Sequence, residues 1–286
     1  MKKDISIGVI GSGTMGSGIA QITAKHQLNV LLFDVEKDVL SSNIKRIHSR
    51  FDRLVEKGKM SEDECEDAKK NILPTTKLEE MADCAFVIEA APEKIDVKKE
   101  IFKKLDEVCG EHTILATNTS SFSVTEIGSI TNRPDRVAGM HFFNPVPLMP
   151  LVEIVKGEKT SQQTIDLLVD LGELVNKLPV TCKDTPGFIV NRVARPYYNE
   201  ALKISNERLA SIEQIDKIMK VSGGFKMGPF ELQDLIGIDI NYTTTESVYG
   251  GFFGDSRFRP SYDQQRKVQA GTLGKKSGGG FYNYEA

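Results

Sequence analysis

The sequence predicts an α/β domain built on a parallel sheet, followed by a smaller all-α domain. Three observations carry this prediction. Short apolar runs alternate with helical patterns, a glycine-rich loop links the first such pair, and strand-like runs fade after Asp184. The 286 residues are enough for a sizeable hydrophobic core. With 37 basic and 40 acidic residues, the net charge of −3 argues against a nucleic-acid partner held by bulk positive charge.

The N-terminal segment predicts a βαβ unit followed by an insertion. Residues 5–10 form a β-branched run, residues 16–26 have a helical pattern, and residues 29–34 form a second apolar run. Strand, helix and strand within so short a stretch favour parallel pairing. Residues 38–73 are charged and helical in pattern, and they are too many for a simple crossover helix. We therefore expect an inserted helical hairpin at about 38–73, ended by Pro74.

Strand and helix patterns alternate again after this insertion, up to a domain boundary. The expected elements are strand 85–90, helix 92–109, strands 113–117, 136–142 and 151–155, helix 161–171 and strand 179–182. The breaker cluster Asp184-Thr185-Pro186-Gly187 then indicates a boundary. Helical patterns at 187–205 and 212–221 follow it. We therefore expect one domain over residues 1–184 and an all-α domain over residues 185–286.

Cysteine usage and hydropathy indicate the cellular setting. The four cysteines, Cys65, Cys84, Cys109 and Cys182, are irregularly spaced and form no C-x-x-C pair. We expect small buried thiols rather than disulfides or a metal site. No apolar run reaches the ~18 residues of a membrane span, and the N-terminus has no signal-peptide pattern. We therefore expect a cytoplasmic protein that binds neither membrane nor nucleic acid.

A glycine loop between the first strand and the first helix predicts a dinucleotide site. Gly11-Ser12-Gly13-Thr14-Met15-Gly16 is a G-x-G-x-x-G sequence, and Asp34 ends the next strand. Gly11 permits a tight turn, Gly13 lets the backbone approach a pyrophosphate, and Gly16 lets helix and strand pack closely. The Asp34 carboxylate would accept hydrogen bonds from ribose hydroxyls and repel a 2′-phosphate, which favours NAD over NADP. A glycine-rich turn without a ligand is the alternative.

Oxidation of an alcohol by a nicotinamide cofactor also requires a base for the hydroxyl proton. His141 lies near the end of the apolar run 136–142, and ligands bind at the carboxyl ends of parallel strands. Glu153 interrupts the apolar strand 151–155, and a buried carboxylate needs a partner. Pairing with Glu153 would fix the tautomer of His141. The alternatives are a satisfied core histidine and a Glu153 that faces solvent.

A polar tetrapeptide follows the strand 113–117. Asn118-Thr119-Ser120-Ser121 presents an amide and hydroxyl groups at the carboxyl edge of the expected sheet. These groups can hydrogen-bond to a ligand, or they can cap the next helix. One residue can cap while its neighbour binds.

Several motifs, spread over nearly the whole chain, resemble those of the L-3-hydroxyacyl-CoA dehydrogenase family. They are the glycine loop, Asn118 to Ser121, His141-Phe142-Phe143-Asn144-Pro145, Lys183 to Arg192, Met227 to Leu232 and Gly274 to Tyr282. Within the family the chain is most similar to bacterial 3-hydroxybutyryl-CoA dehydrogenases. The resemblance implies a Rossmann-type NAD-binding domain with an inserted helical hairpin. An all-α C-terminal domain for substrate binding and dimerisation is implied to follow it.

The resemblance also implies roles for individual residues. His141 is implied to be the catalytic base and Glu153 its partner, while Ser120 and Asn191 hold the substrate's C3 oxygen and thioester end. The residues expected to contact NAD, from the loop and from the resemblance, are Gly11, Ser12, Gly13, Thr14, Met15, Gly16, Asp34, Glu93, Lys98, Asn118, Ser120, Asn144 and Lys276.

The implied reaction interconverts (S)-3-hydroxybutyryl-CoA, or another 3-hydroxyacyl-CoA, and the 3-oxoacyl-CoA such as acetoacetyl-CoA with NAD(H). Lys57 is implied to contact CoA, and Arg53, one helical turn earlier, either joins it or belongs to an ordinary solvated face. A dehydrogenase of a free hydroxy acid such as L-gulonate is the alternative, although a free acid has no CoA phosphates. A silent NAD-binding protein should have lost His141, Glu153 or Ser120.

The expected C-terminal domain contains aromatic residues that could form a homodimer interface. They are Phe225, Phe230, Phe252 and Phe253. Packing of the same side chains in the core of their own domain is the alternative.

Overall fold

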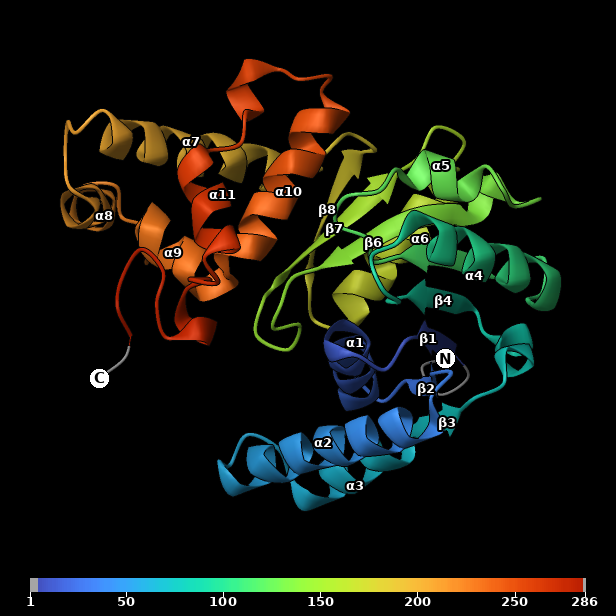
Figure 1. Cartoon of the computed structure of the whole chain (residues 1–286). Helices are drawn as coiled ribbons and strands as arrows, with labels where there is room; N and C mark the ends of the chain where they lie inside the picture. Colours follow the sequence, from blue (N-terminus) through green and yellow to red (C-terminus); the bar gives the residue numbers. More distant parts are fainter. Residues whose placement is uncertain (1–4, 285–286) are drawn as a thin grey trace. The chain divides into compact units, whose positions relative to one another are not determined.

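The computed structural model describes residues 5–284, and contacts between its elements divide the chain into two units (Figure 1). The first unit extends to Asp184, and the second begins at Thr185. Strands and helices alternate in the first unit, whereas the described part of the second has helices and short 3-10 turns. The predicted fold class is confirmed.

The first unit is built on an eight-stranded sheet with the order β3-β2-β1-β4-β5-β6-β7-β8. The strands are β1 Ser6–Ile10, β2 Asn29–Phe33, β3 Ile72–Thr75, β4 Phe86–Glu89, β5 Ile114–Thr117, β6 Val137–Phe142, β7 Leu151–Lys156 and β8 Leu178–Lys183. Neighbouring strands are parallel except for the antiparallel pair β6 and β7. Because β1 lies between β2 and β4, the strand order reverses at β1, the usual place for a ligand in such sheets.

Helices cover both faces of this sheet. They are α1 Thr14–Lys25, α2 Lys37–Glu56, α3 Glu62–Lys70, α4 Ile95–Val108, α5 Val124–Gly128 and α6 Gln162–Leu174. Val9 and Ile88 belong to one buried apolar cluster, and Val87 and Leu115 belong to another, which also contains Phe102 of α4. Successive strand residues point to opposite faces, so both faces of these strands are apolar and buried, as is typical of parallel sheets.

Helices α2 and α3 form a hairpin inserted after β2. On α2, the apolar residues Leu40, Ile44, Ile47 and Phe51 recur every three or four positions and pack on one of the sheet's apolar clusters. Helix α3 begins with a capping box, in which the Ser61 hydroxyl accepts from the backbone N–H of Glu64.

The hairpin is followed by an edge strand that the sequence did not reveal. The expected hairpin, about 38–73, ends at Lys70 in the structure, and Ile72–Thr75 forms β3 beside β2. Pro74 lies inside this strand. Proline is tolerated there because an edge strand leaves one of its sides without a partner strand.

The second unit is helical over its described residues. Its elements are α7 Val190–Asn206, α8 Ile212–Val221, α9 Pro229–Ile236, α10 Ile238–Gly251 and α11 Tyr262–Gln269, with 3-10 turns at Ser256–Phe258 and Lys275–Ser277. Two buried carboxylates tie its segments together. Asp216 accepts hydrogen bonds from the backbone N–H groups of Phe230 and Glu231 at the start of α9. Asp234 accepts from the N–H groups of Phe281 and Tyr282 in the C-terminal segment.

The four aromatic residues considered for a dimer interface have different environments. Phe230 is fully buried in the core of the second unit, and Phe252 stacks on Phe258 with 4.8 Å between ring centroids. Phe225 and Phe253 are exposed, at 50% and 99%. Core packing thus accounts for Phe230 and Phe252, whereas Phe225 and Phe253 remain candidates for an interface.

The four cysteines are free thiols, and burial raises the pKa of Cys109 and of Cys182 to about 12. Neither is therefore a reactive thiolate near neutral pH.

Between residues 5 and 284, no helix is long and apolar enough to cross a membrane.

Candidate active site

The glycine loop connects β1 to α1 at the point where the strand order reverses. A side chain on Gly16 would collide with the Gly11 carbonyl oxygen, and Gly11 itself has a φ of +95°. Packing and backbone conformation within the protein therefore explain why glycine is needed at both positions. Gly13 differs, because a Cβ there would meet no atom within 4 Å. Gly13 precedes the first turn of α1 and provides no side-chain cap, so the helix N–H groups and the open space fit a pyrophosphate.

Asp34 comes directly after β2 and is bound to the glycine loop. One of its carboxylate oxygens, Oδ2, accepts hydrogen bonds from the Ser12 N–H at 2.8 Å and from the Ser12 hydroxyl at 2.7 Å. Strands β1 and β2 are paired in register up to Ile10 and Phe33, so the loop and the acid emerge side by side. The structure thus brings these two expected NAD contacts together, with the carboxylate beside the loop.

His141 and Glu153 face each other across the antiparallel pair β6 and β7. The two residues are direct partners in the strand register, and the His141 Nδ1 lies 2.8 Å from a Glu153 carboxylate oxygen. Both side chains are buried, at 7% and 1% exposure. A carboxylate accepts only, so His141 donates from Nδ1, and its lone pair is then on Nε2. The Phe143 ring packs against the imidazole, with centroids 4.6 Å apart.

The segment after β5 meets a carboxylate from the segment after β4. Glu93 Oε1 accepts hydrogen bonds from the Thr119 hydroxyl at 2.5 Å, the Ser120 N–H at 3.0 Å and the Ser121 hydroxyl at 2.9 Å. Glu93 and Ser120, two of the expected site residues, are therefore in contact. Residues 118–121 do not cap the next helix, because the N-cap of α5 is Ser123.

Asn118 connects this segment to the strand that holds His141. Its side-chain oxygen accepts from the Phe142 N–H at 2.8 Å, and its own N–H donates to the Glu89 carbonyl at 2.8 Å. Asn118 therefore binds the strands on both sides, β4 and β6, at their carboxyl ends. This places the polar segment next to His141.

Lys98 forms a buried ion-pair network that the sequence did not indicate. Its ammonium lies 2.8 Å from Glu89 and 3.1 Å from Glu93, and the Lys98 and Glu89 side chains are 1% and 0% exposed. Glu89 also accepts from the Thr117 hydroxyl at 2.7 Å and from the Ala91 N–H at 2.7 Å. The expected NAD contact Lys98 is thus enclosed, and its charge holds Glu93 in place.

The electrostatics of Glu93 follow from this network. Burial raises its pKa, but the Lys98 charge and the hydrogen bonds from Thr119 and Ser121 outweigh burial and leave the pKa below the ordinary value. Glu93 is therefore ionised at neutral pH and accepts hydrogen bonds from the Ser120 segment.

The sequence matches the models of a known enzyme family over both units. The NAD-binding domain of 3-hydroxyacyl-CoA dehydrogenase matches residues 6–185, and the C-terminal domain of the same enzymes matches residues 187–284. The chain belongs to the 3-hydroxyacyl-CoA dehydrogenase family. The predicted family, the NAD-dependent dehydrogenase class and the NAD cofactor are confirmed by these matches.

Relatives in this family cover the chain almost completely. The 3-hydroxyadipyl-CoA dehydrogenase of Escherichia coli is 48% identical over 98% of this chain, which spans only 59% of that relative. A probable 3-hydroxybutyryl-CoA dehydrogenase of Bacillus subtilis is 45% identical, covering 97% of this chain and 96% of the relative. The crystal structure of (S)-3-hydroxybutyryl-CoA dehydrogenase from Ralstonia eutropha has a TM-score of 0.95 at 40% identity, covering 98% and 99% of the two chains.

The remaining expected site residues of this family member are described one by one. Asn144 is exposed after β6, and Arg53 and Lys57 are exposed at the end of α2, where neither forms an ion pair with any residue from 5 to 284. In the second unit, Asn191 lies in the first turn of α7. Lys276 binds both carboxylate oxygens of Asp239, at 2.6 and 2.7 Å.

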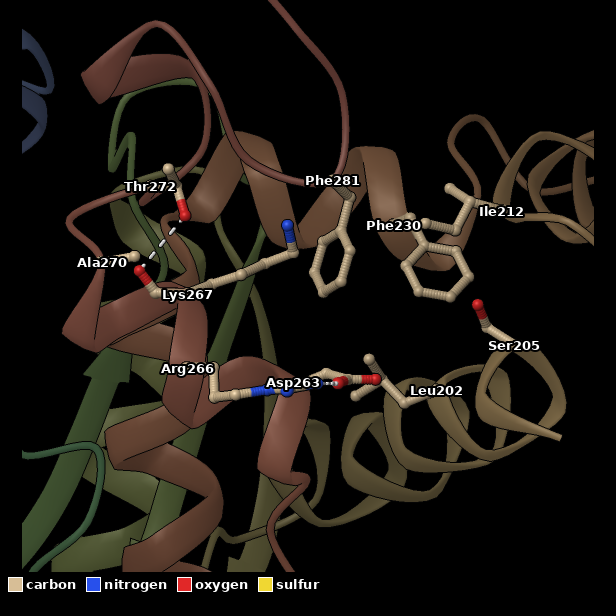
Figure 2. A pocket seen from close by; sticks show the side chains of 10 residues that line it. All are labelled: Leu202, Ser205, Ile212, Phe230, Asp263, Arg266, Lys267, Ala270, Thr272 and Phe281. Atoms are coloured by element: carbon tan, nitrogen blue, oxygen red, sulfur yellow. Dashed lines mark hydrogen bonds and ion pairs between the residues drawn. The ribbon is translucent and has the colours of Figure 1, made fainter. Parts of the chain in front are cut away.

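The second unit also contains a pocket of about 360 Å³, whose charged side chains are already engaged (Figure 2). Phe230 and Phe281 meet edge to face in its wall. Arg266 binds Asp263 at 2.9 Å, and the Lys267 ammonium donates to the Gly280 carbonyl at 2.7 Å. These cations have protein partners, so the pocket offers no unpaired charge for the dehydrogenase substrate.

Proposed function

We propose that this chain interconverts a 3-hydroxyacyl-CoA and the corresponding 3-oxoacyl-CoA, with (S)-3-hydroxybutyryl-CoA and acetoacetyl-CoA as a substrate pair. The observation that carries the proposal is the buried hydrogen bond between His141 and Glu153, in a chain of this family. The relatives named above act on CoA thioesters of 3-hydroxy acids, which supports the substrate class.

His141 acts as the general base. With Nδ1 donating to Glu153, Nε2 accepts the proton of the substrate's C3 hydroxyl during oxidation and returns it to the C3 oxygen during reduction. The adjacent Glu153 carboxylate stabilises the positive charge on the imidazolium. Ser120 and Asn191 donate hydrogen bonds to the C3 oxygen and the thioester end, as oxyanion-type stabilisation.

The glycine loop fits NAD, which when bound accepts the hydride from C3. The open space at Gly13 and the helix N–H groups receive the pyrophosphate, with Ser12, Thr14 and Met15 lining the loop. Asp34 accepts from the adenosine ribose. The other proposed contacts are Glu93, Asn118, Ser120, Asn144 and Lys276, with Lys98 acting through Glu93.

Three further assignments concern the CoA phosphates, the roles of the two units and a homodimer. Arg53 and Lys57 have no ion-pair partner among the described residues and present positive charge to the CoA phosphates. The first unit, residues 1–184, serves as the NAD-binding domain, and residues 185–286 contribute substrate contacts. The exposed Phe225 and Phe253 support a homodimer formed through this second unit.

The direct test follows NADH absorbance with acetoacetyl-CoA and with free acetoacetate. We expect oxidation of NADH with the CoA ester at a rate far above that with the free acid. No oxidation with the CoA ester would refute the proposal. Activity with the free acid alone would favour the free hydroxy acid alternative, of the L-gulonate type.

Asp34 should determine the choice of cofactor. We expect Asp34→Ser to raise the ratio of kcat/KM for NADPH to that for NADH about 10-fold or more, because a charged group's hydrogen bonds to ribose are lost and repulsion of a 2′-phosphate ends. The ratio corrects for any general loosening of the loop, which Asp34 also holds through Ser12. Asp67→Ser removes an exposed carboxylate from α3 and serves as the matched control. An unchanged ratio in Asp34→Ser contradicts the role.

A further inference from the structure

Arg195 places a buried positive charge in the second unit without a carboxylate partner. It lies on α7, one helical turn after Asn191, and is 3% exposed. Its Nη1 donates to the Asn241 carbonyl at 2.8 Å and to the Thr245 hydroxyl at 3.0 Å, and its Nε donates to the Asn191 carbonyl at 3.2 Å. These bonds orient the guanidinium but bring no negative charge, and none of them uses Nη2.

This environment is unusual for a charge, because buried charges are normally paired. Within residues 5–284, no Asp or Glu forms an ion pair with Arg195. Burial lowers its pKa to about 10, while Tyr198 acts in the other direction, so the guanidinium remains charged at neutral pH. The guanidinium lies over the Tyr198 ring, 5.0 Å from its centroid, but no described carboxylate compensates the charge.

The other buried charges of this unit are fully engaged. Asp216 and Asp234 each accept from two backbone N–H groups, and tyrosine hydroxyls donate to both. The more exposed Arg266 and Lys267 of the pocket in Figure 2 also bind protein oxygens. Arg195 is different, since its only acceptors are neutral oxygens.

A buried amide donor without a partner belongs to the residue whose carbonyl Arg195 binds. The Asn241 side chain is 1% exposed, and its Nδ2 is buried without a hydrogen-bond partner in the described structure. Buried donors of this kind are rare and call for an explanation. Two acceptors nearby, Gln264 Oε1 and Asn199 Oδ1, also lack a partner, so these amides indicate incompletely paired polar atoms around Arg195 and do not select the charge of a ligand. The unpaired guanidinium is what favours a carboxylate.

We propose that Arg195 binds a carboxylate at the far end of the substrate's acyl group, so that the protein prefers 3-hydroxyacyl-CoA thioesters of dicarboxylic acids. This rests on the proposed function, which assigns Asn191 to the C3 and thioester end. The guanidinium contacts the Asn191 backbone and therefore lies beside the place assigned to the acyl group. The CoA phosphates are assigned to Arg53 and Lys57 of the other unit, so they do not account for Arg195.

The first test uses the wild-type protein with NADH bound and needs no variant. Adipyl-CoA and hexanoyl-CoA have the same chain length and differ in the terminal carboxylate, so their dissociation constants are compared by calorimetry. We expect adipyl-CoA to bind about 10-fold or more tightly, as for a charge-assisted hydrogen bond in a buried site. Equal affinities overturn the proposal. Free adipate binding as tightly as adipyl-CoA would also overturn it, since the carboxylate would then come from a free acid.

The second test compares kcat/KM for 3-oxoadipyl-CoA and 3-oxohexanoyl-CoA with NADH. Arg195→Met should lower the ratio of the two values about 10-fold or more, mainly through KM, and Arg195→Lys should restore part of it. Lys203→Met removes an exposed charge from the same helix and should keep the wild-type ratio. A ratio that is the same in the wild type and in Arg195→Met overturns the inference and leaves the proposed function intact. No activity of the wild type with either thioester refutes the proposed function itself.

Discussion

His141→Gln is expected to lower kcat about 10²–10⁴-fold, the usual cost of losing a general base. The substitution removes the nitrogen that takes the C3 hydroxyl proton, while the glycine loop and Asp34 are untouched. The dissociation constant for NADH, measured by fluorescence titration, should therefore remain within about threefold of wild type, below 1 kcal/mol. Stopped-flow measurement of NADH oxidation with acetoacetyl-CoA gives kcat directly.

Two further variants test whether the fall in kcat comes from the loss of the base at His141 and not from the loss of any histidine. His112→Gln replaces an exposed histidine before β5 and should keep the wild-type kcat. Glu153→Gln should lower kcat as well, because an amide can donate to Nδ1 and stabilise the wrong tautomer of His141. A kcat of His141→Gln close to that of the wild type would exclude this residue as the base.

The sequence predicts the first unit's sheet well because most of its strands are buried on both faces. Such strands appear as continuous apolar runs, and β1, β4 and β5 could each be recognised in this way. Strand β3 lacks this signal, since it lies at an edge, includes Pro74 and leaves Leu73 half exposed. Its existence depends on pairing with β2, a long-range contact that no local pattern reveals.

In the site, too, single residues could be recognised from the sequence, whereas contacts between distant residues could not. His141 and Glu153 stood out separately, as polar residues in apolar strands, but their contact depends on the antiparallel register of β6 and β7. That register depends on the connecting loop, so the sequence could suggest that the two residues pair but could not establish it. In the structure the two atoms are 2.8 Å apart. Glu89 was missed because an acid at the end of a strand is also the ordinary sign of a strand boundary.

Lys98→Met should cause the largest loss of stability among the substitutions considered. Lys98 and Glu89 are 1% and 0% exposed, so the substitution leaves the Glu89 carboxylate buried without its cation. Removing one partner of a buried ion pair typically costs about 3–5 kcal/mol, which corresponds to a fall in Tm on the order of 10 °C for a protein of this size class. Calorimetry in the absence of ligands measures the effect.

Neighbouring residues on the same helix provide the control. Lys99 pairs with Glu126 at the surface, where the two side chains are 33% and 50% exposed, so Lys99→Met should cost less than about 1 kcal/mol. The double variant Glu89→Gln and Lys98→Met removes both charges and should recover much of the loss, because the penalty comes from the unpaired carboxylate. If Lys98→Met were as stable as Lys99→Met, the network could not be what holds Glu93 against the Ser120 segment, and its position would depend on the hydrogen bonds from Thr119, Ser120 and Ser121 alone.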